Sequence, residues 1–264
     1  MQRDVSAHLG LTVSGPATLI FSAAVSPRGA DLREQIEITV HGRRVEPTTF
    51  TDHYGSRLHR IKCGAGPVTF GYRATVTGQG DLDVASDIDL VTFMRPSRYC
   101  ESDTLDPTAA AEFGSLEGHA LLAAVASWVH DKLYYVSGSS LPTDGAVRTL
   151  LARQGVCRDF AHLTIALLRA RDVPARLVSV YAPGLSPMDF HAVCEAWVDG
   201  AWHLVDATWL APRQTLVRIA TGRDAADTAF LTSHGGEVTL DTMEVSAVVD
   251  ALPRDDWSSL VDLR

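Results

Sequence analysis

The spacing of apolar residues changes once along this chain, near residue 107, and that change restricts the folds that are possible. Before it, short runs rich in β-branched and aromatic residues alternate with turn signals and show no helical period. Such runs predict strands, which here are Leu9–Val13, Thr18–Val25, Gln35–Val40, Leu58–Cys63 and Val68–Val76. Because several short strands at this spacing are typical of two packed sheets, we expect residues 1–80 to form a β-sandwich-like N-terminal domain.

Helical spacing dominates after that point. Apolar residues recur at helical intervals over residues 116–133, and a second helix is predicted over Asp144–Arg153 with Asp144 as its N-cap. A third helix should begin at about residues 156–158 and stop before Pro174, which disfavours helix at the preceding residue. Strand patterns follow, so we expect an α+β domain over residues 107–264. A crossing rich in Gly, Asp, Ser and Pro, over residues 81–106, should join it to the sandwich.

The charge and the cysteines exclude several classes of protein. A formal net charge of −9, with no run of Lys or Arg, argues against nucleic-acid binding, which needs a basic face. No apolar run approaches the ~20 residues of a membrane helix, and the N-terminus lacks the apolar stretch of a signal peptide. We therefore expect a cytoplasmic protein without a membrane partner. The four cysteines form neither a CxxC pair nor a zinc motif, so we expect free thiols, no bound metal and no cofactor.

Cys157 stands where a loop becomes the third predicted helix. Backbone N–H groups without partners and the positive end of the helix dipole lie at such a position, and both stabilise a thiolate. The same N–H groups can hold the oxyanion of a tetrahedral intermediate. A small buried hydrophobic side chain is the alternative interpretation of a cysteine at a helix start.

The pair Asp199–Gly200, flanked by alternating apolar residues, predicts a two-residue hairpin turn. Counting outward from that turn places His191 opposite Thr208. His191 and Asp206 then share a face as diagonal neighbours, roughly 7 Å apart at the backbone. A carboxylate within hydrogen-bond reach of an imidazole is the arrangement of a general base and the group that orients it. A bulge of one residue would put the two side chains on opposite faces.

Each of these residues, taken alone, has a simpler explanation. His191 could be a histidine at a loop edge, and Asp206 a turn residue at the end of a strand. A metal site formed by both with Cys157 is a further alternative, but no pair among the three has the close spacing typical of zinc ligands. The shared strand face, together with a cysteine at a helix start, favours a Cys157–His191–Asp206 triad.

Four segments carry a resemblance to a known family. Gly155–Leu163 (GVCRDFAHL) is similar to the cysteine motif of bacterial transglutaminase-like proteins, and Val173–Arg176 (VPAR) matches the Pro-Ala-Arg that follows the helix there. His191–Val198 (HAVCEAWV) resembles the family's His-Ala-Trp-Val segment, with extra residues between the His and the Trp. Trp202–Thr208 (WHLVDAT) resembles the strand that ends in the family's Asp. The clear match covers about residues 135–210, and the β-rich N-terminal part resembles the extra β domain of bacterial transglutaminase-like cysteine proteases.

This resemblance implies a papain-like, transglutaminase-like α+β core and makes residues 107–264 the catalytic domain. It implies that the thiolate of Cys157 attacks an acyl carbon, that a thioester forms, and that water or an amine resolves it. The backbone N–H of Cys157 would be one oxyanion donor and Tyr135 the candidate for a second, although a core or turn tyrosine is the simpler explanation. Asp159 is a candidate for orienting the helix start, or else an acidic first-turn residue favoured by the dipole.

We therefore expect a thiol-dependent amide- or peptide-bond hydrolase or acyltransferase that acts on a peptide or protein substrate. Hydrolysis is favoured over cross-linking, because water is always present and the sequence shows no site for an amine. The alternative is a catalytically silent transglutaminase-like module that binds a partner or serves as a scaffold. All three triad positions hold usable residues, which favours the enzyme.

Overall fold

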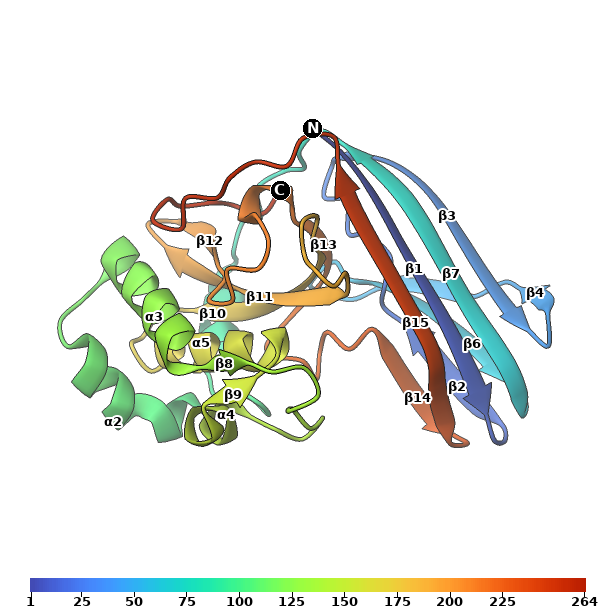
Figure 1. Cartoon of the computed structure of the whole chain (residues 1–264), viewed down its shortest axis with the longest axis horizontal. Coiled ribbons are helices and arrows are strands. Elements are labelled where there is room, and N and C mark those ends of the chain that lie inside the picture. Colours follow the sequence, from blue (N-terminus) through green and yellow to red (C-terminus); the bar gives the residue numbers. More distant parts are fainter.

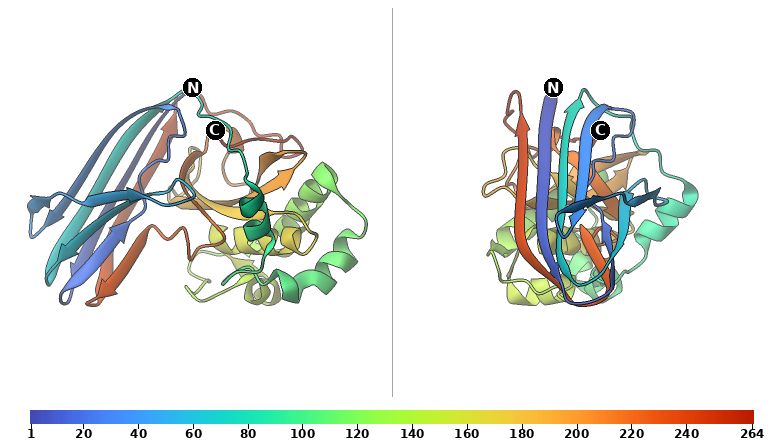
Figure 2. Two further views of the ribbon diagram at one scale, coloured as in Figure 1. Left: turned by 180° about the vertical axis from the view of Figure 1, so that it is seen from behind. Right: turned by 90° about the vertical axis from the view of Figure 1, so that its right-hand side faces the viewer.

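The computed structural model describes all 264 residues and contains a β-sandwich packed beside a unit of helices and a third sheet (Figure 1). The expected α+β class is confirmed, since strands predominate in the first part of the chain and helices in the middle. Both termini lie at the same end of the molecule (Figure 2). None of the helices has the length and apolar character required to cross a membrane.

The sandwich consists of a five-stranded sheet of order β15-β1-β7-β3-β4 and a four-stranded sheet of order β14-β2-β6-β5. Side chains alternate between buried and more exposed along β1 and β7, as a sheet with one covered face requires. Phe21 stacks on Phe70 between the sheets, with ring centroids 4.7 Å apart. The strands from the first part of the chain are β1 Gln2–Val13, β2 Ala17–Phe21, β3 Asp31–Val40, β4 Arg43–Val45, β5 Thr48–Thr51, β6 Arg57–Cys63 and β7 Gly66–Thr77.

Two strands from near the end of the chain complete the sandwich. β14 (Leu231–Gly235) pairs with β2, and β15 (Val238–Val249) pairs with β1, both antiparallel. Sheet membership therefore departs from the expected division, which assigned all of residues 107–264 to the catalytic domain. Without these partners β1 and β2 would each be an open sheet edge, and a partner so distant in the chain leaves no local sequence pattern.

Helix α5 lies at the centre of the second unit. Every residue from Asp159 to Arg169 is buried, and the helix packs against strands β10 and β11 and helices α2, α3 and α4. The three predicted helices are present as α3 Gly118–Lys132, α4 Ala146–Ala152 and α5 Cys157–Arg169. The sheet of this unit has the order β12-β11-β10-β13. Its strands, with the short elements nearby, are β10 Ala175–Tyr181, β11 Phe190–Val198, β12 Ala201–Val205, β13 Val217–Gly222, β8 Tyr134–Tyr135, β9 Gln154–Gly155 and the 3-10 turn η1 Arg213–Thr215.

Two details of the helices differ from the sequence-based expectation. The N-cap of α4 is Gly145 and not Asp144, whose carboxylate instead accepts a hydrogen bond from the N–H of Leu141. The predicted crossing is partly helical, since α1 (Asp87–Met94) lies within it and α2 (Ser102–Phe113) begins in it. A capping box closes the start of α1, in which Ser86 and Asp89 each accept from the other's backbone N–H.

Glu195 on β11 is the centre of a buried ion-pair network. Its carboxylate oxygens lie 2.6 Å from Arg176 and 2.7 Å from Arg218. Arg176 also pairs with Asp83 of the crossing, which in turn pairs with Arg28 of the sandwich. Burial raises the pKa of Glu195, but the charges and hydrogen bonds of the two arginines outweigh burial and lower that pKa to about 2. The network therefore ties the third sheet to the segment that enters it from the sandwich.

Candidate active site

Cys157 is the first residue of α5, as predicted, and it is half-buried. Asp159 holds the residues before it in place, because its carboxylate accepts hydrogen bonds from the N–H of Val156 at 2.8 Å and the hydroxyl of Ser140 at 2.9 Å. Gly155 permits this close approach, since a Cβ there would lie 2.6 Å from the Cβ of Asp159. Asp159 therefore orients the helix start through hydrogen bonds, in addition to any effect on the helix dipole.

The hairpin around Asp199–Gly200 has the predicted register, with Trp197 opposite Trp202. The ladder ends immediately before Asp206. The Oδ2 atom of Asp206 lies 3.0 Å from Nε2 of His191, so the predicted hydrogen bond is present. Both side chains are buried. No bulge interrupts the pairing of β11 with β12. The side chains of His191 and Asp206 therefore meet on one side of the hairpin, as predicted.

Hydrogen bonding distinguishes the two ring nitrogens of His191. Because Nε2 donates to Asp206, Nδ1 is the nitrogen left to accept a proton, and it is buried without a conventional partner. Burial lowers the pKa of His191, but the charge and hydrogen bond of Asp206, with smaller contributions from the Cys157 thiol, outweigh burial and raise it overall. Burial raises the pKa of Asp206, but His191 and neighbouring hydrogen bonds lower it overall. Cys157, His191 and Asp206 thus form one interacting chain.

Thr208 supports Asp206 and was not among the residues that sequence analysis singled out. Its backbone N–H and its hydroxyl both donate to Oδ1 of Asp206, at 2.8 and 2.7 Å. One carboxylate oxygen is therefore held by Thr208 and the other by His191, which fixes the plane of the carboxylate. The Asp-x-Thr spacing is a recognisable turn pattern, but its role depends on the burial of Asp206.

Tyr135 lies beside Cys157 because β8 pairs with β9 and puts Tyr135 opposite Gly155. Burial raises the pKa of Tyr135 to about 12, and the charge of the nearby Cys157 thiol contributes in the same direction. Tyr135 and Cys157 are therefore close enough to influence each other electrostatically. The ring packs against Phe160 and remains 45% exposed, so Tyr135 is not a core tyrosine.

The other three cysteines lie in environments that favour the protonated thiol. Burial raises the pKa of Cys63, raises that of Cys100 to about 12, and raises that of Cys194 well above its usual value. Cys194 packs in the core around α5 and away from the triad, in agreement with its odd spacing from His191 along β11. Cys157 is therefore the cysteine that the fold brings to a histidine base.

The geometry of the three side chains suits proton transfer better than metal binding. Nε2 of His191 lies 3.0 Å from Asp206, and the Cys157 thiol contributes to the raised pKa of the same ring. Ligands of one metal ion would instead direct their donor atoms at a common point. No group of three or more His, Cys, Asp or Glu side chains in the chain has an arrangement that could hold a metal ion.

A solved structure matches nearly the whole chain. It is described as a "putative cysteine protease" from Cytophaga hutchinsonii, is 34% identical, and covers 97% of this chain and 93% of that chain with a TM-score of 0.89. The family model of the Transglutaminase-like superfamily matches residues 107–207. That range includes Cys157, His191 and Asp206.

Curated relatives match a shorter segment. An uncharacterized protein of Mycobacterium leprae is 31% identical over 122 residues, which are 42% of this chain and 42% of the relative. An uncharacterized protein of Mycobacterium tuberculosis is 36% identical over 123 residues, which are 40% of this chain and 39% of the relative. The match therefore spans about two fifths of the length of either curated relative.

Proposed function

This chain belongs to the transglutaminase-like superfamily, and we propose that it is a thiol-dependent hydrolase of amide or peptide bonds with a Cys157–His191–Asp206 triad. The orientation of His191 is the observation that carries this proposal. Its Nε2 bonds Asp206 at 3.0 Å, and its buried Nδ1 is free to interact with the Cys157 thiol. A base held in one tautomer beside a half-buried thiol is what thiol acyl transfer requires.

The first half-reaction forms a thioester. His191 Nδ1 takes the proton of the Cys157 thiol, and the thiolate attacks the carbonyl carbon of the substrate, so that a C–S bond forms and an electron pair moves to oxygen. When this intermediate collapses, the C–N bond breaks and the leaving amine takes the proton from Nδ1. Asp206 stabilises His191 while the ring carries that proton.

The second half-reaction returns the enzyme to its starting state. His191 Nδ1 removes a proton from water as the water oxygen attacks the thioester carbon. A C–O bond forms, the C–S bond breaks, and the carboxylic acid leaves while the proton on Nδ1 returns to the sulfur. We favour water over an amine as the acceptor because water reaches any half-buried thiol, whereas no site for an amine is evident.

A cysteine-selective reagent tests the nucleophile. Iodoacetamide at mildly acidic pH should modify Cys157 well before the other three cysteines, because protonated His191 stabilises the Cys157 thiolate, whereas burial raises the pKa values of Cys63, Cys100 and Cys194. Peptide mapping by mass spectrometry identifies the modified residue. Cys63 is the internal control, since it is also half-buried. Equal, slow modification of all four thiols would support the alternative of a silent binding or scaffold module.

Tyr135 is proposed to donate a hydrogen bond to the oxyanion, together with the backbone N–H of Cys157. Tyr135→Phe keeps the ring packed against Phe160 but removes the hydroxyl. We expect kcat for peptide hydrolysis to fall about 10²-fold with little change in KM, because an oxyanion donor acts mainly in the transition state. Tyr134→Phe is the matched control, since Tyr134 is 76% exposed and next in sequence. If Tyr135→Phe keeps the wild-type kcat, the hydroxyl of Tyr135 is not an oxyanion donor and the residue serves only in packing.

Peptides or proteins are the proposed substrates, in keeping with the description of the Cytophaga protein as a cysteine protease. A mixed peptide library, incubated with the protein in the presence and absence of a fluorescent primary amine, separates the two possible outcomes. Hydrolysis creates new peptide termini, and amine transfer attaches the fluorophore. We expect new termini to predominate; incorporation of fluorophore without new termini would identify a transferase.

A further inference from the structure

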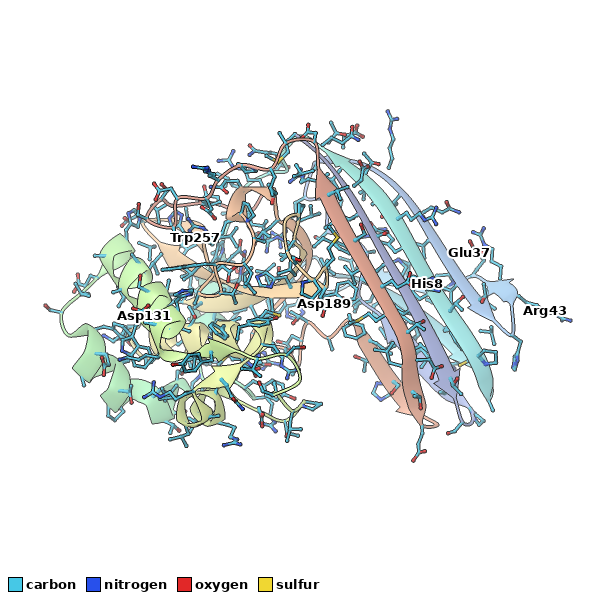
Figure 3. The ribbon with its side chains drawn as sticks, in the orientation of Figure 1. His8, Glu37, Arg43, Asp131, Asp189 and Trp257 are labelled. Carbon is cyan, nitrogen blue, oxygen red and sulfur yellow. The ribbon has the colours of Figure 1, made fainter.

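The last residues of the chain return from the sandwich to the candidate active site. We call residues 250–264 the C-terminal strap. It begins after β15 at Asp250, which exchanges hydrogen bonds with Gln2 of β1, and it then crosses to the unit that carries the triad (Figure 1). Trp257 of the strap lies over that unit (Figure 3). The end of the strap is anchored by Leu263, which is buried.

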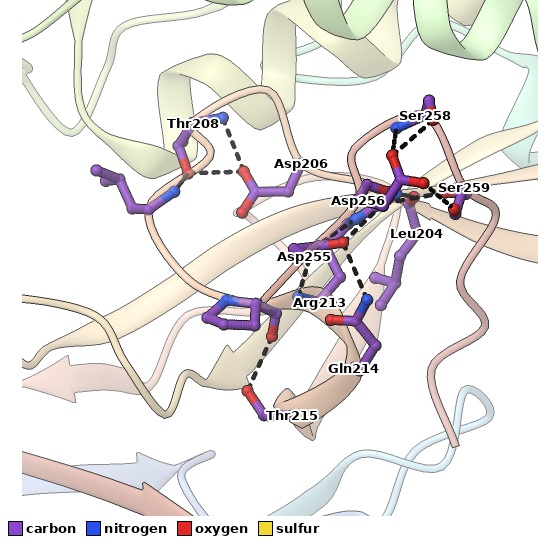
Figure 4. Close-up of polar contacts among 12 residues, drawn as sticks. Leu204, Asp206, Thr208, Arg213, Gln214, Thr215, Asp255, Asp256, Ser258 and Ser259 are labelled. Atoms are coloured by element: carbon purple, nitrogen blue, oxygen red, sulfur yellow. Dashed lines mark hydrogen bonds and ion pairs between the residues drawn. The ribbon is translucent and has the colours of Figure 1, made fainter. Parts of the chain in front are cut away.

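One anchor of the strap lies on the loop that follows Asp206 (Figure 4). Asp255 forms a buried pair with Arg213, accepting hydrogen bonds from Nε at 2.9 Å, Nη2 at 3.0 Å and the backbone N–H at 2.8 Å. Gln214 donates a further bond to the same carboxylate at 3.0 Å. Arg213 also donates to the carbonyl of Leu204, which precedes Asp206. We call residues 206–212, between β12 and η1, the Asp206 loop. Arg213, which the strap holds through Asp255, therefore ties together the two ends of this loop.

Two more contacts of the strap fall before and within the same loop. The N–H of Leu204 donates to the carbonyl of Val261 at 2.7 Å, so the strap adds a backbone hydrogen bond near the end of β12. Trp257 stacks on Trp209 with centroids 5.9 Å apart, and Trp209 stacks on His130 of α3 at 3.7 Å. The strap thus contacts the loop at both ends and in its middle.

We propose that the C-terminal strap holds the Asp206 carboxylate in place and that Asp255 and Trp257 are positioning residues. The proposal rests on the proposed function, in which Asp206 orients His191. Asp206 lies beyond the last ladder pair of β12, so sheet hydrogen bonding does not fix it. Apart from His191, its hydrogen-bond partner is Thr208 of the same loop. The carboxylate therefore moves with the loop, and the strap holds the loop closed.

A displaced Asp206 should have a pH-selective effect on Cys157. An aligned carboxylate stabilises protonated His191, and protonated His191 stabilises the thiolate in mildly acidic solution. Misalignment should therefore slow alkylation of Cys157 at acidic pH but have little effect at alkaline pH, where the thiolate forms without the imidazolium. Asp189 is the other charged group near His191, and it is unchanged in the variants below. A general loss of packing would not produce this selectivity.

The test compares Asp255→Asn with Asp256→Asn, a neighbour whose carboxylate bonds only Ser258 and Ser259. The probe is iodoacetamide, and the readout is the rate of Cys157 alkylation. We expect Asp255→Asn to slow the reaction about tenfold at about pH 5.5 and less than about twofold at about pH 9. Asp256→Asn should behave as wild type. If Asp255→Asn matches Asp256→Asn, or slows alkylation equally at both pH values, the proposal is wrong.

Two further variants make the result unambiguous. Asp255→Asn leaves Arg213 buried without its partner, so thermal melting is used to verify that the variant is folded at the assay temperature. Trp257→Ala keeps the Arg213–Asp255 pair and decides the question if Asp255→Asn is unfolded. It should show the same pH-selective slowing of alkylation, and wild-type rates at both pH values would overturn the proposal.

Asp206→Asn separates this inference from the proposed function. If Asp206→Asn slows alkylation at about pH 5.5 and folded strap variants do not, the strap proposal alone is wrong; if Asp206→Asn has no effect, the role proposed for Asp206 is wrong.

Discussion

Replacement of His191 by alanine is expected to lower kcat for peptide hydrolysis by about 10⁴-fold or more, the scale found when a member of a triad is removed. His191 is the group proposed to accept the thiol proton, deliver it to the leaving amine and activate water, so its loss affects both half-reactions. The measurement is kcat for a peptide that the wild-type protein cleaves.

The control for this experiment is His119→Ala. His119 pairs with Asp199 at 3.2 Å, but the pair lies on the surface, with the His side chain 45% exposed. It reproduces a histidine–carboxylate contact without access to Cys157, and we expect kcat to stay within about twofold of wild type. Because the triad acts as a unit, the double variant of Cys157→Ala with His191→Ala should be scarcely slower than either single variant. A His191→Ala variant that retains a tenth of wild-type kcat would contradict the role of His191 as base.

Replacement of Glu195 by glutamine is expected to lower the free energy of unfolding by about 3–5 kcal/mol, the range for loss of one partner from a buried ion pair. Arg218 would then be buried without the carboxylate that balances its charge, and Arg176 would keep only Asp83 as an ion-pair partner. The same strand, β11, carries His191, so disorder around Glu195 should also disturb the candidate site. Urea unfolding at neutral pH, followed by tryptophan fluorescence, measures the difference.

Glu244→Gln is the matched control, because Glu244 is an exposed residue of β15 and the change in side chain is identical. We expect it to change the free energy of unfolding by less than about 0.5 kcal/mol.

The pKa of Glu195 is lower in the folded protein than in the unfolded chain, so the contribution of Glu195 to stability is present above the unfolded pKa and is lost as the pH falls toward about 2. The difference in the free energy of unfolding between wild type and Glu195→Gln should therefore become smaller in acid. A loss below about 1 kcal/mol at neutral pH would contradict the proposed importance of the network.

The sequence by itself determined the parts of the site whose residues lie near one another in the chain. The Asp199–Gly200 turn sets the register of β11 against β12, and because side chains on a strand alternate with a period of two, the register puts His191 and Asp206 on one face. The loop-to-helix transition likewise predicted Cys157 at the start of α5. These features could be predicted because a turn and a helix start are specified by a few consecutive residues.

Only the tertiary structure decided the contacts between distant segments. β14 and β15 return to the N-terminal sheets, Tyr135 reaches Cys157 through the pairing of β8 with β9, and Asp255 reaches Arg213 across the strap. The physical reason is that the pattern of apolar residues tells which face of an element is buried but does not name the element that covers it. Partners separated by a long stretch of chain are chosen by the packing of the whole molecule.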